Sequence, residues 1–424
     1  MAATSVIPQG FLTKDNIQGI VESALRPISR CARVLVIHPD YSRTDCTDQI
    51  ARAAHEILLA RGLQTMDAFN SAGTHRKMTR EETLSKLGFT DATPCLRRLF
   101  SHEFDNPEQL AYLGDLPAEY IASETGGAIH QAIPVTANKI IFDNYDLVIC
   151  IAATKPHEAA GFAGGTKLLV PGIVGGDVTA SFHWAAALVG LPNILGKADN
   201  PARRIIDRAA GMIMDRLGDT PILLLNMVLA EDDHGGMAVK GLFPGMGLAG
   251  FKQAFAQSVE MSNELHFIKV AQPITRAVQR MHNVYDEIWT AGKGSYYLQI
   301  PGVLAPDAEV IIFAPHIHAF HSNQAMDAAI REIGYHGRDY VLDFLTRNPG
   351  FNLNIASHVM NVRGVNEDFR VTLATGISEA DCKAVSLGYR DPASIRREDF
   401  EGSQSLWVDH GGLWTYVLHQ SDRM

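Results

Sequence analysis

Apolar runs rich in β-branched residues alternate with helix-like stretches along most of the chain, and this alternation constrains the fold more than any other feature. We expect strands at 33–39, 63–70, 146–153, 221–230, 309–315 and 369–375. We expect helices at 46–62, 79–88, 179–190, 200–218, 250–265 and within 323–348. Strands that alternate with helices form βαβ units, in which the strands pair in parallel. The predicted fold class is therefore α/β, with a first sheet that is doubly wound and mostly parallel.

The length of the chain, 424 residues, exceeds the size at which a single hydrophobic core stops growing. A second alternating series begins after the helix expected at 250–265, so we predict two α/β domains, 1–265 and 266–424. No Pro/Ser-rich linker or solenoid repeat separates the two series. We expect the domains to be joined by short segments and the active site to lie in the cleft between them.

Composition excludes several classes of protein. Hydrophobic residues make up 46% of the chain and charged residues 20%, without an uncharged apolar run long enough to span a bilayer. The first residues lack a basic segment followed by an apolar run, so we expect a cytoplasmic protein. The five cysteines form no Cys-x-x-Cys pair. A net charge of -10 and the absence of a basic cluster interleaved with aromatics argue against nucleic acid as a partner.

One glycine-rich stretch carries three reactive side chains, His157, Lys167 and His183. Six of the sixteen residues from 161 to 176 are glycine, which lets the backbone approach a bound group closely and adopt positive φ. Glycine amides ahead of a helix also suit a phosphate, although the loop is not a Walker A sequence. A flexible connection with satisfied polar residues is the alternative interpretation.

Polar residues also follow three of the expected strands. His38, Asp40 and Arg43 follow the apolar run 33–37, Gly73, Thr74 and His75 follow the strand at 63–70, and Lys155 and His157 follow the strand at 146–153. Open α/β sheets bind ligands beyond the carboxyl ends of their strands, so these side chains are candidates for one crevice. Helix caps or loop ion pairs would explain each of them singly.

Two further motifs are weak. Residues 245–250 fit G-x-G-x-x-G before a helix, but they lie late in their domain rather than after its first strand. They leave open a nicotinamide-dependent 2-hydroxy acid oxidoreductase. His316, His318 and His321 resemble the run of zinc hydrolases, with Phe320 where an aspartate belongs. We expect these histidines to line a substrate pocket.

Four motifs together resemble the lactate racemase family of nickel-pincer enzymes, which racemise or epimerise 2-hydroxy acids. Asp40-Tyr-Ser-Arg43 resembles D-x-T-R, and Gly73-Thr-His75-Arg resembles G-T-H-R. Pro156 through Lys167 resembles P-H-x-x-A-G-F-S-G-G-A-K, and His183 stands at the spacing of the next family histidine. The likeness spans most of the chain.

The resemblance implies a pyridinium mononucleotide that carries nickel in a sulfur-carbon-sulfur pincer and is attached through a thioamide to Lys167. It further implies His183 as the nickel ligand, and His75 and His157 as the catalytic acid–base pair. In this interpretation the N-terminal domain carries the cofactor and the catalytic histidines, and hydride passes reversibly between C2 and the cofactor through a 2-keto acid. Additional cofactor contacts are assigned to Gly164, Gly165 and Thr166.

The remaining assignments concern the substrate. Arg43 and Lys293 would bind its carboxylate, with Asp40 orienting its neighbours. The family pattern Y-Q-x-x-K-G reads Trp289-Thr290-Ala-Gly-Lys293-Gly here, which points away from lactate. A sugar acid and a hydrophobic 2-hydroxy acid that stacks on Trp289 both stay open. Expected partners are the 2-hydroxy acid and the accessory proteins that build the cofactor, without a membrane. A homodimer and a noncatalytic small-acid binding protein also stay open.

Overall fold

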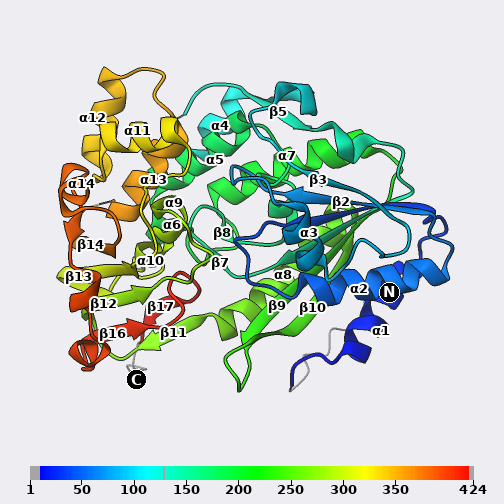
Figure 1. Cartoon of the computed structure of the whole chain (residues 1–424). Coiled ribbons are helices and arrows are strands. Elements are labelled where there is room, and N and C mark those ends of the chain that lie inside the picture. Colours follow the sequence, from blue (N-terminus) through cyan, green and yellow to red (C-terminus); the bar gives the residue numbers. More distant parts are fainter. Residues whose placement is uncertain (1–9, 128, 366, 420–424) are drawn as a thin grey trace, which may run out of the picture. The chain divides into compact units, whose positions relative to one another are not determined.

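The computed structural model describes residues 10–127, 129–365 and 367–419 (Figure 1). The chain divides into two compact units. The first unit comprises Met1–Lys155, Phe162–Thr179 and Arg203–Leu265, and the second comprises Pro156–Gly161, Ala180–Ala202 and His266–Met424. Residues 156–161 and 180–202, which the predicted division places in the N-terminal domain, thus group with the C-terminal part of the chain. The domain limits 1–265 and 266–424 stay a prediction.

A six-stranded sheet forms the centre of the first unit, in the order β10-β9-β6-β1-β2-β3. Its strands are β1 (Arg33–Pro39), β2 (Thr65–Ser71), β3 (Leu96–Ser101), β6 (Leu147–Ala153), β9 (Ile222–Glu231) and β10 (Met237–Met246). All neighbours pair in parallel except β10, which is antiparallel to β9. The chain winds outward from β1 in one direction to β3 and in the other to β10, which is a doubly wound topology. The predicted fold class is therefore confirmed.

Helices and two small two-stranded sheets complete the described part of the first 265 residues. The helices are α1 (Lys14–Leu25), α2 (Thr47–Ala60), α3 (Arg80–Leu87), α4 (Ala118–Glu124), α5 (Gly176–Val189), α6 (Leu191–Ile194), α7 (Pro201–Leu217) and α8 (Gly247–Leu265). The further strands are β4 (Leu110–Leu116) with β5 (Ile133–Asn138), and β7 (Pro156–His157) with β8 (Gly161–Phe162). The sequence pattern missed β3, β4 and β5. β3 and β4 are mostly half-buried or exposed, and buried residues of β5 alternate with half-buried ones, so none of the three carries a continuous apolar run.

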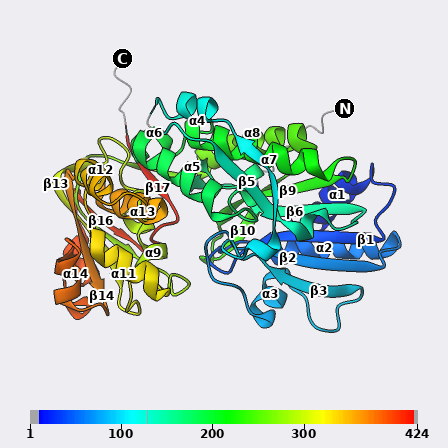
Figure 2. The same ribbon diagram turned by 90° about the horizontal axis from the view of Figure 1, so that it is seen from above.

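The core of the first unit forms on one face of the sheet. Val34 and Val36 of β1 share an apolar cluster with Ile17 and Val21 of α1, and α1 contacts α2. These positions recur every two residues on the strand and every four on the helix, as the two periodicities require. Leu35, between the two valines, is also buried, so both faces of β1 are covered. Figure 2 shows β1 and β2 side by side in this sheet.

A second sheet, with five parallel strands in the order β15-β14-β13-β12-β16, forms the centre of the second unit. Its strands are β12 (Ile274–Arg280), β13 (Leu304–Ala314), β14 (Phe369–Thr375), β15 (Gly388–Tyr389) and β16 (Ser405–Val408), and β11 (Phe267–Val270) pairs with β17 (Thr415–Leu418). The helices are α9 (Ile288–Ala291), α10 (Lys293–Tyr296), α11 (Gln324–Ile333), α12 (Arg338–Arg347), α13 (Leu353–Arg363) and α14 (Glu379–Ala384). Within the described residues, each helix is too short or too polar to cross a bilayer.

Candidate active site

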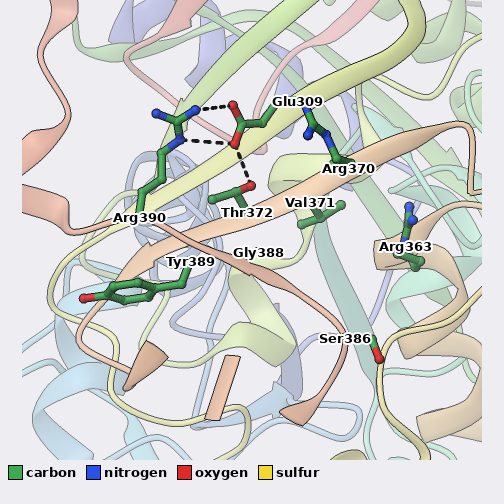
Figure 3. Close-up of a pocket in the computed structure, with 9 residues that line it drawn as sticks. All are labelled: Glu309, Arg363, Arg370, Val371, Thr372, Ser386, Gly388, Tyr389 and Arg390. Carbon is green, nitrogen blue, oxygen red and sulfur yellow. Dashed lines mark hydrogen bonds and ion pairs between the residues drawn. The ribbon is translucent and has the colours of Figure 1, made fainter. Parts of the chain in front are cut away.

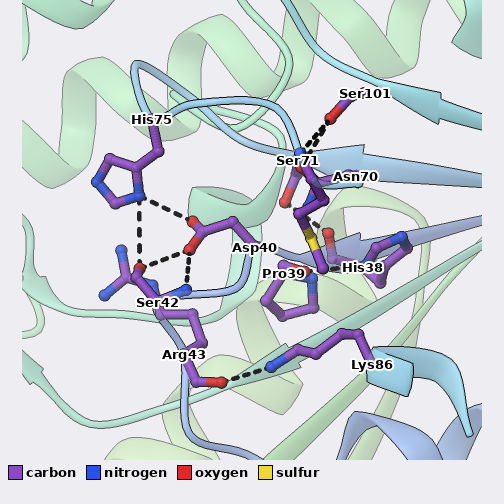
Figure 4. A network of polar contacts seen from close by, with 11 residues as sticks. His38, Pro39, Asp40, Ser42, Arg43, Asn70, Ser71, His75, Lys86 and Ser101 are labelled. Atoms are coloured by element: carbon purple, nitrogen blue, oxygen red, sulfur yellow. Dashed lines mark hydrogen bonds and ion pairs between the residues drawn. The ribbon is translucent and has the colours of Figure 1, made fainter. Parts of the chain in front are cut away.

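The loops after β1 and β2 meet at the carboxyl edge of the first sheet. The register pairs Pro39 with Ser71, so the residues that follow them are neighbours. His75 Nδ1 lies 3.2 Å from Asp40 Oδ2 and 3.4 Å from Ser42 Oγ (Figure 4). Because a carboxylate only accepts, His75 donates through Nδ1 and carries the lone pair on Nε2. The prediction that successive strand ends bring these side chains together is confirmed for Asp40 and His75.

Asp40 interacts with the three polar side chains nearest to it in these loops, His75, Arg43 and Ser42. Burial alone would raise its pKa, but the charge and hydrogen bond of His75, the charge of Arg43 and the Ser42 hydroxyl together hold the pKa well below its usual value. Ser42 donates to Asp40 Oδ1 through its backbone amide at 2.7 Å and through its hydroxyl at 2.5 Å. Asp40 is therefore ionised at neutral pH and holds the His75 ring through a hydrogen bond, and its role toward the substrate stays a prediction.

A buried ion pair between α3 and the loop after β1 holds that loop in place. Lys86 of α3 lies 2.9 Å from Asp45 and also donates to the backbone carbonyl of Arg43. His38 is fully buried, and burial lowers its pKa to about 4, so it is neutral and structural at neutral pH. The sequence pattern missed Lys86, because nothing in a helix so far along the chain indicates contact with this loop.

The turn that carries Lys167 is fixed from α7. Lys167 lies in a short 3-10 turn, η3 (Gly165–Leu168). Buried Arg203 donates to the carbonyls of Phe162 and Gly164 and to Thr166 Oγ1, which in turn donates to Asp207 at 2.5 Å. The Arg203 guanidinium also lies over the ring of Phe255, 4.1 Å from its centroid. These contacts hold Lys167 on a rigid backbone.

Contacts within the chain explain the glycines around Lys167. A Cβ on Gly161 would lie 1.8 Å from Lys197 O, and a Cβ on Gly164 would lie 2.2 Å from Thr154 Oγ1. Gly165 has φ +60°, and its amide donates to Asn226 Oδ1 at 3.4 Å. Close packing and positive φ therefore account for these glycines. The assignment of Gly164, Gly165 and Thr166 to cofactor binding stays a prediction.

His157 is buried in β7, and its Nδ1 contacts the two residues that follow it in the chain. The Ala159 amide donates to Nδ1 at 3.1 Å, so the neutral ring carries its proton on Nε2. The Glu158 carboxylate lies 3.4 Å from the same nitrogen. It would stabilise the ring once Nδ1 gains a proton, which makes Glu158 a positioning residue that the sequence pattern did not single out.

His183, on α5, is oriented by α13. Its Nδ1 lies 3.0 Å from Asn354 Oδ1, an amide oxygen, so Nδ1 donates and the lone pair remains on Nε2. An imidazole held in this way through one nitrogen is the usual arrangement of a metal ligand. The sequence did not indicate Asn354, which lies 171 residues farther along the chain.

Three predicted substrate contacts lie on α9 and α10. Trp289 packs against the rings of His321 and His358, with centroids 5.2 and 4.6 Å away. Thr290 is buried and donates to the carbonyl of Glu287, so its hydroxyl has a structural partner. Lys293 is buried, 5.7 Å from the centre of the Tyr285 ring.

The three histidines after β13 take separate positions. His316 pairs with the Tyr285 carbonyl, and exposed His318 pairs with the Gly376 carbonyl. Of the three, His321 alone packs on the Trp289 ring, and the expectation that these histidines line a substrate pocket stays a prediction. Across the part of the chain that the structure describes, no three His, Cys, Asp or Glu side chains gather as a metal site.

Comparison with known proteins then decides the family. Residues 18–190 match the model of the lactate racemase N-terminal domain. A crystal structure of a Thermotoga maritima protein, solved in a structural genomics programme, is 42% identical in sequence. It superimposes with a TM-score of 0.93, and the match covers 98% of this chain and 100% of that one. The chain belongs to the lactate racemase family.

The fold of this lactate racemase family member is shared more widely. The lactate racemase apoprotein from Thermoanaerobacterium thermosaccharolyticum superimposes with a TM-score of 0.66 at 16% identity. That match covers 98% of this chain and 95% of the other. A search of curated proteins returned no match.

In this family member, the glycine motif at 245–250 has a packing role. It joins the antiparallel edge strand β10 to α8, instead of following a parallel strand as a dinucleotide site requires. A Cβ on Gly245 would lie 2.1 Å from Gly250 O. The close approach of these two backbones explains the glycines, so the motif gives the oxidoreductase alternative no structural support.

Proposed function

We propose that the chain is an isomerase that inverts C2 of a 2-hydroxy acid with a nickel-pincer nucleotide attached to Lys167. Membership in the lactate racemase family favours a racemase or epimerase. The observation that carries the proposal is the hydrogen bond between His75 Nδ1 and ionised Asp40, which leaves a basic nitrogen on His75. Inversion at C2 through a keto acid requires such a base for the hydroxyl proton.

The donor groups of the chain fit the cofactor. Lys167 offers an amine on a turn that Arg203 and Thr166 hold in place. His183, oriented by Asn354, offers a neutral imidazole nitrogen of the borderline-soft kind that nickel accepts. When bound, the group supplies the reversible removal of hydride from C2 that makes the carbon planar. We assign to the chain one nickel ligand, His183, and one covalent anchor, Lys167.

Two histidines of complementary protonation move the hydroxyl proton. His75 accepts it at Nε2, and the Asp40 charge stabilises the imidazolium that forms. His157 acts as the acid in its doubly protonated form, with the Glu158 carboxylate 3.4 Å from Nδ1. It gives the Nε2 proton to the oxygen of the planar acid and is left neutral. In the reverse direction the two rings exchange roles, with Glu158 placed to stabilise protonated His157.

The substrate contacts follow from charge and shape. Arg43 binds the carboxylate through its guanidinium, and Lys293 adds a second positive charge. Trp289 offers an aromatic face beside His321. This combination of an aromatic face and a polar ring suits a 2-hydroxy acid longer than lactate, and a sugar acid is our first candidate.

Intact-protein mass spectrometry tests the cofactor assignment. The chain is produced together with cofactor-building accessory proteins, and nickel is measured in the same sample. We expect an added mass and nickel in the wild type and in Lys252→Ala, an exposed control on α8, but not in Lys167→Ala. An unmodified wild-type mass, or an adduct that survives in Lys167→Ala, would contradict the proposal.

Activity is tested with the same preparation. A panel of 2-hydroxy acids, including lactate, aldonic acids and aromatic acids, is separated by chiral chromatography after incubation. We expect interconversion of the C2 isomers of at least one acid by wild type, with no net oxidation. Net oxidation coupled to a free dinucleotide would favour the oxidoreductase alternative instead.

A further inference from the structure

An arginine-lined cleft opens at one edge of the five-stranded sheet of the second unit. Its volume is about 500 Å³, within the range of small-molecule sites (Figure 3). The side chains that matter for its chemistry are Glu309, Arg363, Arg370, Thr372, Tyr389 and Arg390. They come from β13, β14, β15 and the end of α13, with the short strand β15 forming the edge.

The cleft is separate from the side chains of Trp289 and His321, which belong to the same unit. Glu309, in the middle of β13, is the register partner of Arg370, near the amino end of β14. The segment with His321 follows the carboxyl end of β13, at Ala314. Five residues of strand, at about 3.3 Å each, span roughly 16 Å between Glu309 and that end. A ligand in the cleft would therefore not touch the Trp289 and His321 side chains.

The one carboxylate that lines the cleft is already neutralised. Arg390 donates to both oxygens of Glu309, at 3.1 and 2.7 Å, and Thr372 donates to Oε1 at 2.8 Å. Partial burial raises the pKa of Glu309, but the bonds from Arg390 and Thr372 lower it on balance. Glu309 therefore stays ionised and is matched by Arg390, which leaves the other two guanidinium groups to set the charge of the cleft.

Those two groups differ in their contacts. Arg363 donates to the Phe369 carbonyl and lies 3.7 Å from Glu367, so it is partly neutralised. Exposed Arg370 makes no hydrogen bond or ion pair with another described residue. Because Glu367 partly neutralises Arg363, the net positive charge of the cleft comes from Arg370. The Arg363 guanidinium adds hydrogen-bond donors beside it.

We propose that this cleft binds a small dianion, either a phosphate monoester or a dicarboxylate, through Arg370 with Arg363 beside it. Both anions present paired oxygens to the fork of a guanidinium, and such charge-assisted bonds are about twice as strong as neutral ones. The Tyr389 hydroxyl adds a polar group to the lining. The site does not depend on the proposed isomerase function.

Isothermal titration of the purified full chain with inorganic phosphate and with succinate tests the proposal, at constant ionic strength set with chloride. We expect at least one of the two anions to bind the wild type, and the tighter one to identify the class. Arg370→Gln should weaken that binding at least about tenfold, and Arg370→Lys should restore part of it.

Arg347→Gln is the matched control, because Arg347 is an exposed, ion-paired arginine on α12. It should leave binding unchanged, and circular dichroism should show that every variant is folded. Failure of both anions to bind would overturn the proposal. So would phosphate binding that is equally tight in Arg370→Gln, because that signal would come from another site, such as one for the phosphate of the cofactor.

Discussion

Replacing Asp40 by asparagine tests the acid–base pair most directly. The substitution keeps the size of the side chain but removes the charge that lies 3.2 Å from His75 Nδ1. The asparagine amide can also donate to Nδ1, which would place the ring proton on Nε2 and remove the lone pair there. We therefore expect the rate of the chemical step to decrease, while the affinity for the substrate, which Arg43 would bind, changes little.

The size of the effect follows from the bond that is lost. A hydrogen bond to a charged group contributes about 1.5–3 kcal/mol. Lost only in the transition state, this amount corresponds to a decrease in kcat of about 10-fold to 150-fold, with KM changed little. Ser42→Ala removes a neutral donor to Asp40 but keeps the charge, so we expect a decrease below about tenfold.

Turnover is measured with whichever 2-hydroxy acid the panel identifies, and the tautomer of His75 by nitrogen-15 NMR of the ring. The NMR measurement needs neither cofactor nor substrate. Asp91→Asn, at an exposed ion pair with Arg80, is the control for the loss of a carboxylate. Wild-type turnover in Asp40→Asn, together with an unchanged ring tautomer, would refute the reasoning.

Three further predictions concern stability. The pKa of His38 in the folded chain, about 4, lies below the ordinary value of 6.5, so protonation favours the unfolded chain and stability is lost as pH falls from 6.5 towards 4. Urea denaturation at several pH values should show that the free energy of unfolding falls less in His38→Gln than in the wild type between pH 6.5 and 4, by up to about 3 kcal/mol. An equal dependence of the free energy of unfolding on pH in both proteins would contradict this. Arg203→Met removes the donor to the Phe162 carbonyl and to Thr166 Oγ1, and one of two donors to the Gly164 carbonyl. It should lower the free energy of unfolding by about 3–5 kcal/mol, whereas a change below about 1 kcal/mol would count against the network. Gly161→Ala should destabilise the chain far more than Gly62→Ala, because both have positive φ but only the first places a Cβ against backbone; similar melting temperatures would disprove this.

Much of the fold could be predicted because its signals are local. The run at 33–39 became β1 with the same limits, and the helix expected at 200–218 became α7 within one residue at each end. Apolar runs and helical periodicity report burial directly, so parallel strands and their helices leave a strong mark. The strands β4 and β5 left none, because β4 has a single buried residue, Leu116, and the buried residues of β5 alternate with half-buried ones.

The candidate site divides in the same way. His75, His157, Lys167 and His183 could be selected from their residue types and motif spacing. Their partners could not: Asn354 beside His183, and Arg203 and Asp207 beside Thr166, are ordinary residues of helices. A glycine motif was also misleading, since Gly245 and Gly250 serve the contact of β10 with α8.

The sequence by itself determined the alternation of buried strands with helices, the doubly wound α/β class and the reactive side chains that follow the strands. Only the tertiary structure decided which nitrogen of each histidine carries the proton, that Asp40 is ionised, and that Arg370 pairs with no other described residue. The physical reason is range. Periodicity and turn chemistry act between residues close in the chain, whereas hydrogen bonds and charges act between neighbours in space, such as His183 and Asn354, that the chain order does not place together.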